Sequence, residues 1–212
     1  MKIAASVSDL SSIEQALLYG ADLIEIRLDR MSETSDDALR HSLSRINLPV
    51  LLTLRSDKEG GEFSGDASGW WDRIEPLIPV ADMVDVEQSF MVHAPRIREM
   101  EKTVIASFHT LSMPGTGELQ DIRNTLAGFG DIPKIVPRPM DYDDVLTLAA
   151  FTHHSPKPVI TSIMGEKFRF ARIMLALFGS SVLFSYVGSP ASAGQFHLKE
   201  AIDLLRSLKD SP

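Results

Sequence analysis

The chain of 212 residues contains no cysteine, so it has neither a disulfide nor a thiolate metal site, which suits a reducing compartment. It also lacks a long basic run, and with a net charge of −8 we do not expect a nucleic-acid partner. No signal-peptide pattern and no apolar stretch of membrane-spanning length is found. These absences predict a cytoplasmic protein that binds neither nucleic acid nor membranes.

The remaining composition is that of a globular protein. Hydrophobic residues make up 44% of the chain, which is enough to build one sizeable core at this length. We therefore expect residues 1–212 to form a single domain.

Strand-like and helix-like segments alternate along the whole chain. The predicted strands cover residues 2–7, 23–29, 49–55, 83–87, 103–109, 132–137, 158–164 and 182–187. The predicted helices cover residues 12–19, 36–45, 69–79, 89–101, 117–128, 142–153, 165–178 and 194–208. Eight such pairs favour a parallel (βα)8 TIM barrel, with an open doubly wound sheet as the alternative. No G-x-G-x-x-G turn follows the first strand, which argues against dinucleotide binding.

The predicted strands carry polar residues on one face. In the second strand, alternation places Glu25, Arg27 and Asp29 opposite Ile24 and Ile26. Other strands repeat the pattern with the pairs Thr53 and Arg55, Asp85 and Glu87, Ser107 and His109, and Ser162 and Met164. Active sites of such barrels lie at the C-terminal ends of the strands, so we expect these polar faces to meet there.

Lys134 interrupts an apolar strand-like run at residues 132–137. Lysine is rarely fully buried unless it is paired or used. A desolvated lysine loses its charge more readily, and the neutral amine attacks ketones, which predicts Schiff-base chemistry. The alternative is a strand-end lysine whose amine reaches out to water.

His109 ends the strand before that of Lys134. Neighbouring strands lie about 4.8 Å apart, so both side chains can reach one small molecule. His109 could then remove a proton next to the carbon that Lys134 has converted to an iminium. The alternative is a histidine that bonds a loop carbonyl.

Arg27, Arg55 and Arg172 are candidate clamps for a carboxylate or a hydroxyl. The planar guanidinium suits carboxylates because it donates two parallel hydrogen bonds. The alternative is that each arginine pairs with a structural carboxylate such as Glu25 or Asp29. For Arg27 we expect both a carboxylate partner and a position facing the ligand.

These residues belong to a set of ordered motifs. The motifs are Glu25-Ile26-Arg27-Leu28-Asp29, Arg55-Ser56-Asp57-Lys58-Glu59-Gly60-Gly61, Ser107-Phe108-His109, Asp131-Ile132-Pro133-Lys134-Ile135, Ser162-Ile163-Met164-Gly165, Arg172 and Gly194-Gln195. In this order, the set resembles the type I 3-dehydroquinate dehydratase family over nearly the whole chain. Each motif is weak alone; their order on the expected barrel elements makes the resemblance specific.

The resemblance implies a lyase of the shikimate pathway that removes water from 3-dehydroquinate to give 3-dehydroshikimate. Lys134 would form the Schiff base, His109 would act as base and then acid, Glu59 would assist the histidine, and Arg172 would hold the substrate carboxylate. Further substrate contacts would come from Glu25, Arg27, Arg55, Met164, Phe184, Ser192 and Gln195. The resemblance also implies a homodimer, and neither a metal nor an organic cofactor is needed, because the protonated imine is the electron sink.

Three features depart from the family pattern. The chain starts at its first barrel strand, without the N-terminal hairpin of many bacterial members. His109 is followed by Thr110-Leu111, where the family often has Asp-Phe. In the last loop Ala191 stands where many members have serine, so we expect Ser192 to substitute by a shift of one residue.

Two other functions remain open from the residues alone. A class I aldolase is also a Schiff-base barrel, but it typically binds a phosphorylated substrate near the last two loops, and the arginines with Gln195 suit a carboxylated ring better. A non-catalytic barrel that binds a small molecule is the other alternative, although binding alone does not require a lysine inside the sixth strand.

Overall fold

The computed structural model describes residues 1–31 and 34–209, and in this part of the chain the strands form one parallel sheet that curls into a barrel. The strands are β1 (Lys2–Val7), β2 (Leu23–Arg27), β3 (Val50–Thr53), β4 (Met83–Glu87), β5 (Thr103–His109), β6 (Ile132–Val136), β7 (Ile160–Thr161), β8 (Val182–Tyr186) and β9 (Phe196–His197). From β1 to β7 each strand pairs with the next, and β1 also pairs with β8. The predicted (βα)8 barrel is confirmed.

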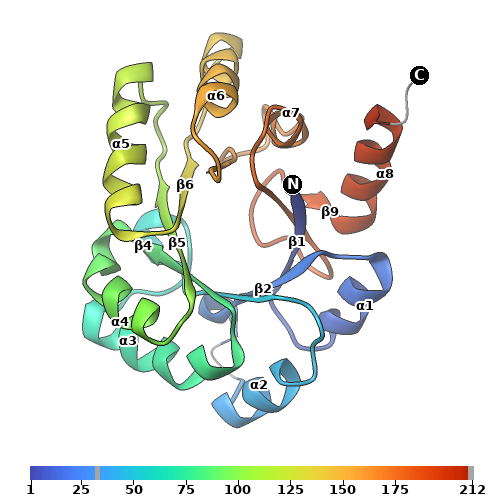
Figure 1. Ribbon diagram of the computed structural model, residues 1–212. Coiled ribbons are helices and arrows are strands. Elements are labelled where there is room, and N and C mark those ends of the chain that lie inside the picture. Colours follow the sequence, from blue (N-terminus) through green and yellow to red (C-terminus); the bar gives the residue numbers. More distant parts are fainter. Residues whose placement is uncertain (32–33, 210–212) are drawn as a thin grey trace.

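The helices surround the strands as an outer ring (Figure 1). They are α1 (Ser12–Tyr19), α2 (Asp36–Leu43), α3 (Ala67–Ile74), α4 (Ala94–Glu99), α5 (Thr116–Phe129), α6 (Tyr142–His154), α7 (Ala171–Leu177) and α8 (Leu198–Lys209). Short 3-10 helices are η1 (Leu28–Arg30), η2 (Asp57–Glu59), η3 (Glu75–Val80) and η4 (Gln88–His93). Within residues 1–31 and 34–209, no helix is both long enough and apolar enough to cross a membrane.

The barrel closes between β7 and β8 with little regular ladder. The Ser181 N–H donates to the Val159 carbonyl at 2.8 Å. The hydroxyl of Ser180 accepts from the Thr161 N–H at 3.0 Å, and that of Ser181 accepts from the Val159 N–H at 3.2 Å. Serine side chains therefore satisfy backbone groups that a longer β7 would have paired, and buried backbone groups need such partners.

Prolines shorten two predicted helices. The segment predicted as a helix over 89–101 is the 3-10 helix η4 followed by α4, with Pro95 in the first turn of α4. Similarly, the helix predicted to end at residue 79 is α-helical only to Ile74 and continues as η3, which contains Pro76 and Pro79. A proline ring clashes with the carbonyl four residues earlier, so an α-helix cannot run through these positions unbroken.

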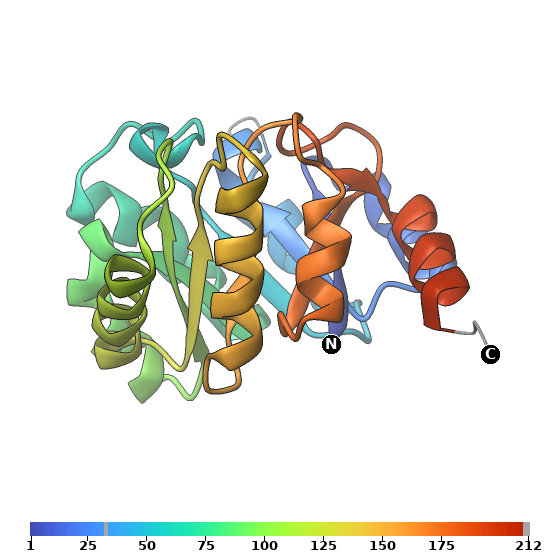
Figure 2. The same cartoon turned by 90° about the horizontal axis from the view of Figure 1, so that it is seen from above.

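The last part of the chain departs further from the predicted boundaries. Helix α7 begins at Ala171 rather than residue 165, because Gly165 has a left-handed φ of 85° that starts a loop instead of a helix. Helix α8 begins at Leu198, because Phe196 and His197 form β9 beside β8. Both irregular segments lie at the rim of the barrel, where the cavity described below opens. Figure 2 shows the barrel from its side, with α6 and α7 adjacent in front.

The barrel interior changes from apolar to polar along the strands. Its lower part is a cluster of buried apolar side chains: Ala4, Leu23, Leu51, Ile105, Ile160, Val182 and Phe184. Two residues further along five of the strands, the inward position is polar: Ser6, Glu25, Thr53, Ser107 and Ser162. A second and larger cluster, between strands and helices, includes Ile24, Ile26 and Trp70. The predicted alternation in β2 is thereby confirmed, with Ile24 and Ile26 packed on the helices.

Candidate active site

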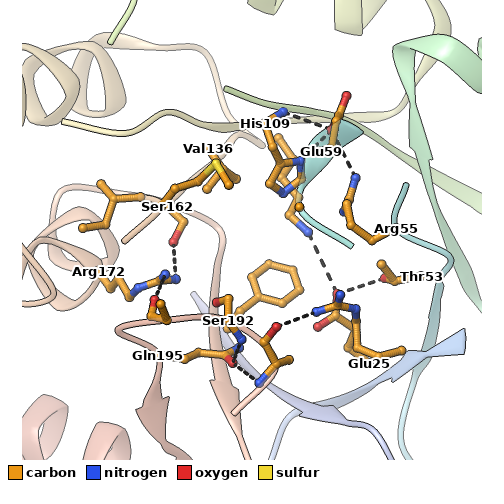
Figure 3. A pocket seen from close by; sticks show the side chains of 18 of the residues that line it. Glu25, Thr53, Arg55, Glu59, His109, Val136, Ser162, Arg172, Ser192 and Gln195 are labelled. Carbon is orange, nitrogen blue, oxygen red and sulfur yellow. Dashed lines mark hydrogen bonds and ion pairs between the residues drawn. The ribbon is translucent and has the colours of Figure 1, made fainter. Parts of the chain in front are cut away.

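A cavity of about 270 Å³ opens at the C-terminal end of the barrel strands. Figure 3 shows its walls, with Arg55, Glu59 and His109 on one side and Arg172, Ser192 and Gln195 on the other. It is lined by all the residues that were predicted to act on or bind the substrate: Glu25, Arg27, Arg55, Glu59, His109, Lys134, Met164, Arg172, Phe184, Ser192 and Gln195. The fold thus gathers motifs spread over most of the chain into one cavity.

Lys134 points from the middle of β6 into this cavity. It is 4% exposed, and its Nζ donates to Asp85 Oδ2 at 2.8 Å. Glu25 Oε1 lies 4.0 Å from Nζ, and the ring centroid of Phe184 is also 4.0 Å away. The amine is therefore buried and paired inside the barrel, which removes the alternative of a lysine that reaches out to water.

Arg55 lies at the centre of a buried cluster of carboxylates. Its Nη2 donates to Asp85 at 2.7 Å, and its Nη1 donates to Glu87 at 2.9 Å and to Glu59 at 3.3 Å. Burial alone lowers the pKa of the guanidinium, but these three negative charges outweigh it and raise that pKa above its usual value. Arg55 lines the cavity with its charge already neutralised by the protein.

Glu59 reaches His109 through a tight turn after β3. The Ser56 hydroxyl caps η2 by accepting from the Glu59 N–H, and Gly60 ends η2 with a φ of 84°. A Cβ on Gly61 would lie 2.1 Å from the Arg55 carbonyl oxygen, so this position accepts only glycine. The turn brings the Glu59 carboxylate back over β3.

Two nitrogens of His109, the backbone N and the ring Nδ1, lie within hydrogen-bond distance of Glu59 Oε2. The backbone N–H donates at 3.0 Å, and Nδ1 lies at 2.8 Å. Because Arg55 also donates to Oε2, this oxygen is an acceptor. With Glu59 ionised, the imidazole proton therefore lies on Nδ1, and Nε2 keeps its lone pair.

Burial shifts the pKa values of His109 and Glu59 in opposite directions, because it favours the neutral form of each. Burial, together with the positive charges of Arg55 and Lys134, holds the pKa of His109 well below its usual value. Burial also raises the pKa of Glu59 to about 8, with Arg55 opposing and the charges of Glu87 and Asp85 adding to the rise. A neutral imidazole is the form that can take a proton.

Arg172 lies across the cavity in different surroundings. Its Nη1 donates to the Ser162 hydroxyl at 3.1 Å and its Nη2 to the Ala193 carbonyl at 3.1 Å, while Nε is buried without a hydrogen-bond partner. Within the described residues no carboxylate forms an ion pair with it. Burial, with the nearby charge of Arg169, lowers the pKa of Arg172 to about 10. Among the described arginines and lysines that line the cavity, Arg172 is the one without a carboxylate partner.

Arg27 combines the two expectations. Its Nε and Nη2 donate to the two oxygens of Asp29 at 2.9 and 2.7 Å, as a planar fork. Its Nη1 donates to the Ala191 carbonyl at 3.2 Å, so the side chain also faces the cavity. It therefore has a structural carboxylate partner and a place in the cavity wall.

The loop over residues 189–195 is folded onto the cavity by polar contacts. Gln195 Oε1 accepts from the N–H groups of Ala191 at 3.0 Å and Ser192 at 3.3 Å. Its Nε2 donates to the Ser6 hydroxyl at 3.2 Å, and Ser6 donates in turn to Glu25. Gln195 thus ties the loop to the floor of the barrel, whereas Ser192 lines the cavity through an exposed side chain.

Sequence reasoning did not single out Ser6 or Arg30. Ser6 shares the inward face of β1 with Ala4, so strand alternation carried the signal. Arg30 lines the cavity and donates to the Pro190 carbonyl at 3.1 Å; its position directly after Asp29 was the available hint. Among the described residues, no group of three or more His, Asp or Glu side chains is arranged to hold a metal ion.

Comparison with known proteins agrees with this geometry. The family model described as type I 3-dehydroquinase matches residues 3–212. A 3-dehydroquinate dehydratase from Methanoregula boonei is 39% identical over 208 residues, covering 98% of this chain and 100% of that protein. One from Methanospirillum hungatei is 40% identical over 200 residues, covering 94% of this chain and 78% of that protein.

A solved structure shows the same fold over the full length. The crystal structure of the 3-dehydroquinate dehydratase from Aquifex aeolicus superimposes with a TM-score of 0.86 at 26% identity, covering 100% of both chains. The family match and these relatives show that the chain belongs to the type I 3-dehydroquinase family.

Proposed function

We propose that this cavity dehydrates 3-dehydroquinate to 3-dehydroshikimate through a Schiff base on Lys134. The observation that carries the proposal is a buried lysine whose side chain lines a cavity of about 270 Å³ together with His109. The names of the relatives supply the substrate, since each is a 3-dehydroquinate dehydratase.

Lys134 performs the covalent step. The amine attacks the substrate ketone, and the carbonyl oxygen takes up the proton that the ammonium gives up, so a carbinolamine forms with the positive charge still on its nitrogen. Loss of water from the carbinolamine leaves an iminium, which withdraws electrons from the adjacent carbon.

His109 moves the next proton. Its Nε2 takes the proton from the carbon next to the iminium, and the resulting enamine expels the hydroxyl as water with a proton returned by the imidazole. Water then hydrolyses the new imine and frees Lys134. Glu59 supports this step because its carboxylate keeps the proton on Nδ1 and leaves Nε2 free to act.

Arg172 binds the substrate carboxylate in this proposal. It is the buried cation without a carboxylate partner, so an incoming anion supplies the missing charge. Gln195, Ser192 and Arg27 lie on the same side, where they can donate to ring hydroxyls. Glu25, Arg55, Met164 and Phe184 complete the wall around the ring.

Borohydride reduction tests the nucleophile and the substrate together. With 3-dehydroquinate present, mass spectrometry is expected to find the reduced adduct on the peptide that carries Lys134. Lys134→Met serves as the control, because it removes the amine and preserves an unbranched apolar side chain. An adduct on another lysine, or equal labelling of the Lys134→Met chain, contradicts the proposal.

We further propose that the protein works in the reducing cytoplasm, which suits a chain without cysteine.

We also propose that the chain works as a homodimer. Large apolar side chains are exposed on the neighbouring helices α6 and α7, and those of Tyr142 and Phe170 are stacked with their ring centroids 6.3 Å apart. The exposed residues of this patch are Met140, Tyr142, Leu146, Phe170, Leu177 and Phe178. Large apolar side chains exposed together on two neighbouring helices suit contact with a second copy of the chain.

Light scattering during gel filtration tests the dimer. Leu146→Asp, which places a charge on α6, is expected to give monomers, whereas Leu18→Asp on α1 is expected to leave the dimer intact. Both leucines are largely exposed, at 62% and 82%, so neither change disturbs the core. A monomeric wild type, or a dimeric Leu146→Asp chain, counts against this surface.

A further inference from the structure

The geometry points to Asp85 as the permanent counter-ion of Lys134, paired with the ammonium before the reaction and with the iminium N–H during it. The inference rests on the proposed role of Lys134 as the Schiff-base residue. Asp85 lies below Lys134 and does not line the cavity, so it acts on the reaction through the lysine nitrogen and not through the substrate.

The two oxygens of the Asp85 carboxylate have separate partners. Oδ1 accepts from Arg55 Nη2 at 2.7 Å and from the Ser107 hydroxyl at 2.5 Å. Oδ2 accepts from Lys134 Nζ at 2.8 Å. Two donors therefore hold the carboxylate in place from one side, and its other oxygen is directed at the lysine.

The strand register explains why these groups meet. Asp85, Ser107 and Lys134 come from three successive strands, β4, β5 and β6, and all three side chains point inward. Ser107 is aligned with Lys134 across the β5–β6 ladder. Ser107 on β5 therefore lies between the Asp85 carboxylate on β4 and the Lys134 amine on β6.

Asp85 stays ionised in this setting. Burial raises the pKa of the carboxyl, but the charges of Arg55 and Lys134 outweigh that effect and hold the pKa far below its usual value. With its side chain 1% exposed, the carboxylate has no water to replace these partners. It is thus a fixed anion, and it is not the group that accepts the proton of Lys134.

The charge balance of imine formation suits a fixed anion. An ammonium and a ketone give an iminium and water, so one positive charge lies on the lysine nitrogen before and after the step. A counter-ion that stays in place stabilises both states. The iminium retains a single N–H bond, and a carboxylate oxygen at 2.8 Å gives that bond a defined direction and thereby orients the attached ring.

Other charged groups also surround Lys134, and they set the background for any pH effect. Around it lie Glu25 and Arg27 from β2, Arg55 after β3, Glu59 from η2, Glu87 from β4 and His109 from β5. Glu87 provides a matched control. Like Asp85 it is a carboxylate of β4 with a side chain 1% exposed that pairs with Arg55, but its hydrogen-bond partners are Arg55 and Ser56.

The experiment compares Asp85→Asn with Glu87→Gln in the full chain. Each change removes one negative charge beside Arg55, and only the first removes the partner of Lys134. Borohydride trapping with 3-dehydroquinate is followed over a range of pH. For Asp85→Asn we expect trapping to slow by about 10- to 150-fold, the usual effect of losing a charged hydrogen bond. The pH above which trapping is lost should be lower by about one to two units, because an iminium without its counter-ion loses its proton more easily.

Glu87→Gln is expected to keep the high-pH limit of trapping found in the wild type, because Glu87 bonds Arg55 and Ser56 and not Lys134. Equal pH profiles for the two variants would overturn the role of Asp85. Failure to trap Lys134 in the wild type would instead refute the proposed function, so the two failures are distinguishable.

If Asp85→Asn does not fold, Ser107→Ala replaces it. This variant retains the carboxylate and removes one donor to Oδ1, so the pH limit is expected to move in the same direction by a smaller amount. An unchanged pH limit in Ser107→Ala would then overturn the proposal.

Discussion

Arg55 and Arg172 are two buried cations on opposite sides of one cavity, and their hydrogen-bond partners differ in charge. Arg55 meets three carboxylates, those of Asp85, Glu87 and Glu59, whereas Arg172 has a hydroxyl and a loop carbonyl as its partners. Accordingly, the pKa of Arg55 is raised by the surrounding negative charges, and burial lowers that of Arg172. The same residue type therefore serves two purposes.

On the Arg55 side of the cavity the charges are paired within the protein, whereas on the Arg172 side a positive charge has no carboxylate partner among the described residues. A buried charge is costly unless it is paired. The cluster around Arg55 is paired internally, and through Glu59 and Asp85 it contacts His109 and Lys134. Arg172 leaves a charge to be neutralised, and a substrate carboxylate can do so. This comparison predicts distinct outcomes for changes on the two sides.

The largest effect is expected from His109, the proposed general base, which lies on the carboxylate side of the cavity. His109→Ala should lower kcat by about 10²–10⁴-fold, the usual contribution of a general base. Because the base acts after Lys134 has reacted, borohydride with 3-dehydroquinate should still trap the Schiff base. Single-turnover kinetics with parallel trapping measures both steps. Near-normal turnover would remove His109 from this role.

Arg55→Leu should chiefly lower stability. It removes the cation shared by Asp85, Glu87 and Glu59, and of these three only Asp85 keeps a second cation, Lys134. Breaking a buried ion pair typically costs about 3–5 kcal/mol in the free energy of unfolding. Arg172→Leu strands no carboxylate, so its change should stay within about 1–2 kcal/mol. Urea unfolding of both variants decides; equal losses would refute the contrast between the two arginines.

Arg172→Ala should chiefly weaken substrate binding. Losing one charged hydrogen-bonding partner costs about 1.5–3 kcal/mol, which corresponds to about 10- to 150-fold in affinity. We expect KM to rise by this factor while trapping on Lys134 persists at saturating substrate. Arg27→Ala is the comparison, because that arginine already pairs with Asp29. A flat KM in Arg172→Ala with a sharp rise in Arg27→Ala would assign the carboxylate to Arg27.

The smallest effect is expected from pH. The pKa of Glu59 is raised to about 8, so its carboxylate form predominates above that pH and is lost as pH falls through it. Protonated Glu59 donates to Nδ1 of His109 and shifts the ring proton to Nε2, which removes the base. Hence kcat/KM should rise with pH and level off above about 8, and at pH 7 it should lie about tenfold below that level.

Glu59→Gln is the matched test of that limb. The variant should be slower, and its kcat/KM should no longer rise between pH 7 and about 9, because the titrating group is gone. A limb that survives in Glu59→Gln would belong to another group.

Much of the architecture was predictable from local pattern. Strand alternation has a period of two residues, so Glu25 and Arg27 could be assigned to the inward face from neighbouring positions alone. Lys134 inside an apolar run likewise indicated a buried amine. Helix ends were predicted less well where Pro76, Pro79 and Pro95 convert α-helix to 3-10 helix, although the residues responsible were visible in the sequence.

The partners of each charge were beyond the reach of the sequence. Asp85 and Glu87 share a face of β4, and local pattern does not say that the first pairs with Lys134, 49 residues later, while the second bonds Ser56. The same holds for Arg55 and Arg172, which look equally suited to a ligand until their neighbours are known. The sequence by itself determined the barrel, its polar inner face and the buried lysine, because periodicity is local. Only the tertiary structure decided which cation is neutralised and which is left for the substrate, because that depends on strand register and on side chains brought together from distant segments.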